Sequence, residues 1–226
     1  MRLFFTPSQS LHKVAIVARE KGLWDRITVV PVYPYRDGYD LGPINPLAKV
    51  PTLALDDGTT FYGSPVICEY FEYLVPSPRF FPSDPRERLE ALRRMALADM
   101  VFEAAVTISL ENGRREGRRQ DVLERQWPKL LRGFAAMESE CPARGSVDIG
   151  DIAALHPLSY VHAGRTAKDP LHPGYDWRTK HPFLSDWYEQ MIQRPAVRGH
   201  VAWRFNGDDS PEALRRQVDA VLAARR

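Results

Sequence analysis

Lys49-Val50-Pro51-Thr52-Leu53, followed by Asp57-Gly58 and then Gly63-Ser64-Pro65-Val66-Ile67, is the stretch that decides the fold of this chain of 226 residues. A proline cannot donate a hydrogen bond to a neighbouring strand, so Pro51 is expected at a strand start, after a cis peptide bond. Such a bond would turn the backbone N–H and C=O of Val50 outward. Asp57-Gly58 tolerates the positive φ of a tight turn, so the runs on either side of it predict a hairpin.

The end of the same stretch predicts the start of a helix. Ser64 is expected to cap this helix, with Pro65 in its first position. The apolar residues behind them share one helical face: Val66, Ile67, Tyr70, Phe71 and Leu74. The first N–H groups of a helix have no partner inside it and can hold an anion. A strand edge and an anion-binding helix end are therefore expected to face one cleft.

This order of strand, cis-proline turn, hairpin and serine-started helix resembles the glutathione transferase superfamily of the bacterial, serine-type branch. The resemblance implies an α/β thioredoxin-like domain followed by an all-helical bundle, with glutathione as co-substrate. It also implies that Val50, before Pro51, pairs through its backbone with the cysteinyl unit. Ser64 and its helix amides would bind the γ-glutamyl carboxylate. Lys49 would pair with the glycyl carboxylate, although an exposed lysine without a ligand fits the sequence too.

One residue departs from the family pattern. The family usually has Glu or Asp before that serine, where it meets the γ-glutamyl ammonium, and this chain has Gly63. Losing one charge-assisted hydrogen bond costs about 1.5–3 kcal/mol. A backbone carbonyl, another side chain or a partner subunit could replace it.

Composition indicates a soluble globular protein of the cytoplasm. Hydrophobic residues make up 44% and charged residues 27%, and the net charge of +2 implies no nucleic-acid partner. Cys68 and Cys141 lack CxxC spacing, and the six histidines lack metal-ligand spacing, so we expect neither a redox dithiol nor a metal. We find no signal peptide or membrane-spanning stretch, and expect no membrane partner.

Periodicity predicts two domains. Strands are expected at 3–6 and 27–32, with a helix at 10–21 between them and a long connection at 33–49. Prolines interrupt all periodicity between about 76 and 85, so we predict a thioredoxin-like glutathione-binding domain at 1–78 and an all-helical domain at 85–226.

The second domain shows only helical patterns. A long helix from about 89 is broken by the basic run at 113–119, which we interpret as a solvated connection rather than a binding site for an acidic ligand. Further helices are expected at 126–140 and around 183–192. Asp148 and Asp151 form a capping box for a buried helix. His156 within that helix is interpreted as a packed core residue rather than a ligand.

Ser8 is the candidate catalytic residue. It precedes Lys13-Val14 at the spacing that serine-type members keep, and lies where the first strand meets the first helix. Its hydroxyl would stabilise the thiolate of glutathione. Ser8 could instead be a turn residue of that junction, and Ser10 is the rival position. The first strand has no Tyr, the turn has no Cys, and the Ser-Ser-Cys signature of the isomerase branch is missing.

Two hypotheses follow. The first is a detoxification-type enzyme that directs the glutathione thiol at a small hydrophobic electrophile, by conjugation or ether cleavage. The second is a non-catalytic binding or interaction module, favoured by Gly63. The resemblance implies a homodimer in either case.

Overall fold

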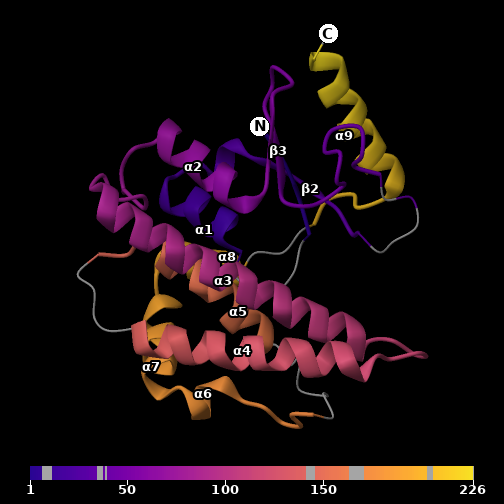
Figure 1. Cartoon of the computed structure of the whole chain (residues 1–226). Coiled ribbons are helices and arrows are strands. Elements are labelled where there is room, and N and C mark those ends of the chain that lie inside the picture. The colour runs from indigo at the N-terminus through magenta and orange to yellow at the C-terminus, as the bar shows by residue number, and fades with distance from the viewer. Residues whose placement is uncertain are drawn as a thin grey trace. The chain divides into compact units, whose positions relative to one another are not determined.

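The computed structural model describes residues 1–6, 12–34, 38, 40–140, 146–162, 171–202 and 206–225. Its contacts divide the chain into two compact units. The first comprises Met1–Ser8, Val14–Pro78 and Ala202–Arg226, and the second comprises Gln9–Lys13 and Arg79–Val201. The elements of both are labelled in Figure 1.

The first unit contains a mixed four-stranded sheet. Its strands are β1 (Arg2–Phe5), β2 (Thr28–Pro31), β3 (Thr52–Ala54) and β4 (Thr60–Tyr62), in the order β2-β1-β3-β4. β1 pairs parallel with β2 and antiparallel with β3, and β3 pairs antiparallel with β4. The hairpin predicted around Asp57-Gly58 is confirmed, and Gly58 takes the positive φ of 84° that this turn requires.

Helices cover both faces of this sheet. The helical elements are α1 (Lys13–Glu20), η1 (Trp24–Arg26), α2 (Ser64–Leu74) and α9 (Pro211–Ala224). Successive side chains of a strand point to opposite faces, so Phe4 faces away from Leu3 and Phe5. Figure 1 shows α9 on the opposite side of the strands from α1 and α2. α9 contributes Leu214, Val218 and Val221 to the core cluster that contains Phe4, Val30 and Ala54.

Polar contacts fix α9 to the strands and turns of the same unit. Arg225 donates from Nε to the carbonyl of Gly58 at 3.0 Å and from Nη2 to Oγ1 of Thr60 at 2.9 Å. Arg2 donates from Nε to Oε1 of Gln217 at 3.0 Å. Residues 202–226 thus group by contact with the first unit. The ranges 1–78 and 85–226 stay predictions about domains.

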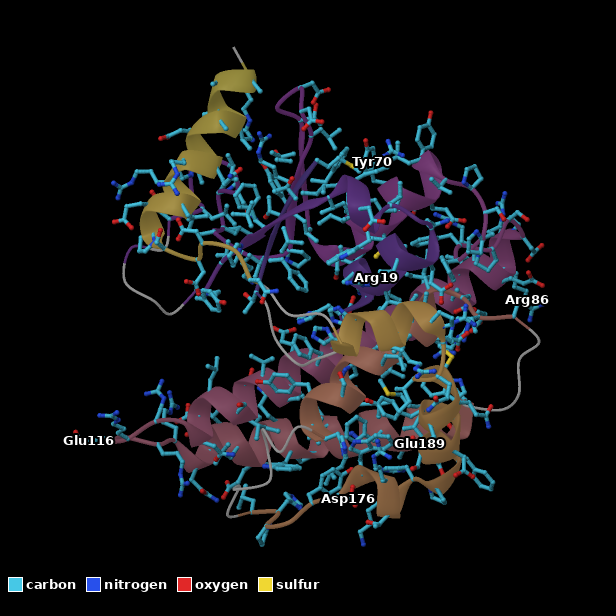
Figure 2. All side chains as sticks on the ribbon, turned by 180° about the vertical axis from the view of Figure 1, so that it is seen from behind. Arg19, Tyr70, Arg86, Glu116, Asp176 and Glu189 are labelled. Carbon is cyan, nitrogen blue, oxygen red and sulfur yellow. The ribbon has the colours of Figure 1, made fainter. Side chains whose placement is uncertain are left out.

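The second unit is helical, which together with the sheet of the first confirms the expected fold class. Its helices are α3 (Pro85–Asn112), α4 (Gln120–Glu140), α5 (Ile149–Tyr160), α6 (Trp177–Lys180), α7 (Pro182–Met191) and α8 (Pro195–Ala202). α3 begins earlier than predicted because Asp84 caps it, accepting from the N–H of Arg86 at 2.9 Å. Glu116 lies at the tip of the α3–α4 connection (Figure 2), whose residues 113–119 are exposed.

Gly133 allows α4 to pack closely against α3. A Cβ at Gly133 of α4 would lie 2.2 Å from Cγ2 of Val101 on α3.

The capping box predicted at the start of α5 is confirmed. Asp148 accepts from the N–H of Gly150 at 2.8 Å, and Asp151 accepts from the N–H of Asp148 at 3.0 Å. None of the described helices has both the length and the apolar character needed to cross a membrane.

Candidate functional site

Val50 and Pro51 directly precede β3 in the first unit, and their backbone forms an edge of the candidate site, here called the Val50 edge. Their peptide bond is cis. Within the described part of the chain, neither the N–H nor the C=O of Val50 has a hydrogen-bond partner. The carbonyl of Pro51 accepts from the N–H of Gly63 at 3.2 Å. This bond brings the Val50 edge next to the start of α2, as the sequence predicts.

Asn45 holds this edge in place, and the sequence analysis missed it. Its side chain is buried, and Nδ2 donates to the carbonyl of Lys49 and to Oγ1 of Thr52, both at 2.8 Å. Oδ1 of Asn45 accepts from the N–H of Leu47 at 3.0 Å. The available signal was an Asn-Pro pair, Asn45-Pro46, which is typical of a turn. The same loop carries a positive φ of 49° at Ala48.

The start of α2 differs from the prediction by one residue. Gly63 is the N-cap, with φ 78° and ψ 143°, and Ser64 and Pro65 are the first two helical residues. This backbone conformation is almost restricted to glycine, which explains why the cap falls there. The helix has no side-chain cap hydrogen bond. Among the described residues, neither the hydroxyl of Ser64 nor the N–H groups of Ser64 and Val66 have a hydrogen-bond partner, so these groups are available for an anion.

Of the other candidate site residues, the structure describes Lys49 but not Ser8. Lys49 is exposed, so its ammonium group is accessible at this edge. Ser8 and its rival Ser10 lie outside the described residues. Thr6, at the end of the described first segment, donates its hydroxyl to the carbonyl of Val32 at 2.8 Å. Val50, Pro51, Gly63 and Ser64 are thus brought together, and the position of Ser8 stays a prediction.

Three imidazole rings form a cluster in the second unit. The ring centroid of His12 lies 4.4 Å from that of His156 and 5.8 Å from that of His200. His156 stacks on Phe102 with centroids 3.7 Å apart, as expected for a packed core residue. Burial lowers the pKa of His12 well below its usual value and, reinforced by the charge of Lys13, lowers the pKa of His156 to about 3.

The rings of His12 and His156 are therefore uncharged at neutral pH. Among residues 1–6, 12–34, 38, 40–140, 146–162, 171–202 and 206–225, no group of three or more His, Cys, Asp or Glu side chains is arranged to hold a metal ion. Cys68 is buried in α2, where it packs with Ile67 and Phe71 on the inward side of the helix. It is not placed as an exposed nucleophile.

Comparison with known proteins gives the family. Residues 8–74 match the model described as glutathione S-transferase, N-terminal domain, and residues 120–190 match the corresponding C-terminal domain. The chain belongs to the glutathione S-transferase superfamily. A solved glutathione S-transferase from Methylobacillus flagellatus with glutathione bound is 30% identical, with a TM-score of 0.77. The match covers 88% of this chain and 98% of that one.

Two curated proteins show similarity to this transferase-family chain. The uncharacterized GST-like protein YibF of Escherichia coli is 29% identical over 192 residues, which cover 83% of this chain and 91% of YibF. The maleylacetoacetate isomerase of Pseudomonas aeruginosa is 31% identical over 146 residues, which cover 61% of this chain and 68% of that enzyme. The Ser-Ser-Cys signature that we associate with the isomerase branch is absent from the sequence.

Proposed function

We propose that this protein binds glutathione and activates its thiol for attack on a small hydrophobic electrophile. The observation that carries the proposal is the pair of unpartnered backbone groups on Val50, held beside the uncapped first turn of α2. A peptide strand can pair with the former, and a carboxylate can bind the latter. Membership of the superfamily and the glutathione bound to the Methylobacillus flagellatus relative support the same assignment.

Each recognition contact has a chemical reason. The N–H and C=O of Val50 hold the cysteinyl unit as an added strand would, which fixes the position of the sulfur. The hydroxyl of Ser64 and the N–H groups of the first turn bind the γ-glutamyl carboxylate, and Lys49 pairs with the glycyl carboxylate. Because Lys49 is exposed, its ion pair contributes at most about 1 kcal/mol.

The chemical step requires glutathione as thiolate. In the proposal, Ser8 donates its hydroxyl hydrogen bond to the sulfur, which lowers the thiol pKa because the charged form is stabilised. The sulfur then forms a bond to the electrophilic carbon, and the leaving group departs with its electron pair. Positioning and thiolate stabilisation account for the acceleration.

Replacing Ser8 tests this assignment. We expect Ser8→Ala to raise the thiol pKa of bound glutathione and to lower kcat/KM at neutral pH by about tenfold or more, because one charge-assisted hydrogen bond is lost. The thiolate absorbance of the complex, followed against pH, measures the first effect directly. Ser10→Ala is the matched control, since Ser10 is the rival position. If Ser10→Ala carries the effect and Ser8→Ala does not, the roles are exchanged.

Substitutions at Gly63 test the vacant acidic position. A Cβ there would meet only Cδ of Pro65 at 3.8 Å, so space is available, but φ 78° is strained for any other residue. We expect Gly63→Ala and Gly63→Glu to lower the free energy of unfolding by a similar amount, about 1–3 kcal/mol. Because both carry this strain, their difference in glutathione affinity isolates the carboxylate. We expect Glu to bind about tenfold more tightly than Ala.

The second candidate is a binding module without turnover, and Gly63 is the feature that favours it. If Gly63→Glu gains no affinity over Gly63→Ala, another group already occupies the ammonium position and the binding site is intact. A gain well above about tenfold, accompanied by turnover that the wild-type protein lacks, would indicate a decayed site, as the second candidate requires.

We also propose a cytoplasmic homodimer, as the superfamily membership suggests. Sedimentation equilibrium of the purified chain at micromolar concentration measures its mass. A monomer of 25.8 kDa would exclude the dimer under those conditions.

A further inference from the structure

Helix α9 contacts the connection between β2 and β3 at both of its ends. At the start of the helix, a Cβ built on Gly38 would lie 2.8 Å from Cβ of Pro211. At its end, Arg225 donates from Nη1 to the carbonyl of Pro43 at 3.3 Å and from Nη2 to that of Ile44 at 3.4 Å. All of these residues belong to the first unit, so the last helix of the chain supports the connection that leads to the candidate site.

Arg225 also joins this connection to the hairpin of β3 and β4. The same guanidinium group donates from Nε to the carbonyl of Gly58 at 3.0 Å and from Nη2 to Oγ1 of Thr60 at 2.9 Å. A Cβ at Gly58 would lie 2.9 Å from the backbone nitrogen of Arg225, so the hairpin turn lies directly against the end of α9. One planar, forked side chain thus bonds the segments that precede and follow β3.

The side chains of Ala48 and Val50 pack against the core to which α9 contributes. Both are half-buried and contact the cluster that includes Ile44, Val218 and Val221. The φ of Ala48 is 49°, in the left-handed region that is unfavourable for a residue with a Cβ. Such a backbone conformation persists only where the surrounding contacts determine it. The conformation of the chain just before the Val50 edge therefore depends on the packing behind it.

Asn45 connects this support to the backbone of Val50. It directly follows Ile44, whose carbonyl accepts from Arg225. Nδ2 of Asn45 donates to the carbonyl of Lys49 at 2.8 Å. The carbonyl of Lys49 and the N–H of Val50 belong to one planar peptide unit, so the bond to Asn45 also fixes the direction of that N–H.

We propose that Arg225 is a positioning residue of the candidate glutathione site. From the end of α9 it holds the connection and the hairpin together, and so keeps the N–H and C=O of Val50 in the direction in which a cysteinyl unit pairs with them. The inference rests on the proposed function, because glutathione is the ligand that the Val50 edge serves. Without Arg225, a smaller fraction of the protein has the competent edge, and the apparent affinity falls in proportion.

Titration calorimetry of Arg225→Ala with glutathione tests the effect on binding. We expect the Kd to rise about fivefold, as it does when the competent fraction falls to about one fifth. Gln217→Ala is the matched control, since Gln217 is also on α9 but accepts from Arg2 of β1 at 3.0 Å. Loss of stability alone would affect both variants, and we expect the Kd of Gln217→Ala to stay within about twofold. A Kd of Arg225→Ala that also stays within twofold of the wild-type value would overturn the inference.

Arg225→Lys separates bridging from charge. A lysine keeps the positive charge that attracts anionic glutathione, but its three donors lie on one atom and cannot reproduce the fork. We expect this variant to bind glutathione about threefold or more weakly than the wild type. Wild-type affinity in Arg225→Lys would show that charge acts without bridging and would overturn the inference.

Amide hydrogen exchange of the ligand-free protein separates the inference from the proposed function. The N–H groups of Ile44, Asn45 and Ala48 form hydrogen bonds within the connection, at 3.1, 2.9 and 2.7 Å. We expect Arg225→Ala to speed their exchange about fivefold or more, and Gln217→Ala to leave it unchanged. Unchanged exchange in Arg225→Ala would overturn the positioning role even if the wild type binds glutathione. A wild type that binds no glutathione would refute the proposed function, and faster exchange would then still support Arg225 as the residue that orders the Val50 edge.

Discussion

Val218→Asp is expected to unfold the first compact unit. Val218 lies on α9 with 4% of its surface exposed, in the core cluster that includes Phe4, Val30 and Ala54. The substitution loses about 1.5–3 kcal/mol of apolar burial and leaves a carboxylate without a partner in the core, which costs several kcal/mol more. Native proteins have about 5–15 kcal/mol in total, so little stability would remain.

Denaturant unfolding followed by circular dichroism measures this loss. Arg215→Ala is the matched control, since Arg215 is on the exposed side of the same helix, and we expect its effect to stay within about 0.5 kcal/mol. A Val218→Asp protein as stable as the Arg215→Ala protein would show that α9 contributes little to the unit in solution.

Acidification from pH 7 to about pH 5 is expected to lower the free energy of unfolding by about 2 to 3 kcal/mol. In the folded protein the pKa of His12 lies well below its usual 6.5, and that of His156 is about 3. The unfolded chain takes up protons below about pH 6.5 while the folded chain keeps these rings neutral. Each ring therefore costs about 2 kcal/mol of stability at pH 5.

Asp151 acts in the opposite direction. The pKa of Asp151 in the folded state, about 6, exceeds the usual 3.8, so the folded state takes up this proton first. The free energy of unfolding gains about 1 kcal/mol from it over the same interval.

The variant His156→Phe tests the contribution of one ring. It keeps a ring against Phe102 and removes one titrating group, so it should reduce the acid-induced loss of unfolding free energy by about 2 kcal/mol. His162→Gln, at an exposed position, is the control. A full loss in His156→Phe would contradict the assignment.

The elements that the sequence predicted correctly depend on local chemistry. Pro51, Asp57-Gly58 and Asp148 with Asp151 determine backbone conformation within a few residues, so their pattern identifies a strand start, a hairpin and a capped helix. Val50 and Ser64 are identified as candidate binding residues by these local patterns together with the family resemblance.

The features that escaped prediction depend on distant contacts or on one backbone angle. α9 packs against strands almost two hundred residues earlier, and no local periodicity says which face of a sheet a last helix will cover. Asn45 is recognised only once Lys49 and Thr52 are in place around it. The N-cap of α2 is Gly63 rather than the predicted Ser64, because glycine alone adopts a φ of 78° without strain.

Calorimetric titration of the purified protein with glutathione, alongside Ser64→Ala, tests the central claim most directly. We expect saturable binding to the wild-type chain in the micromolar to millimolar range. Ser64→Ala should bind about tenfold more weakly, because the γ-glutamyl carboxylate loses one hydrogen-bond donor. No saturable binding to the folded wild-type protein would contradict the account, and so would an affinity that Ser64→Ala leaves unchanged.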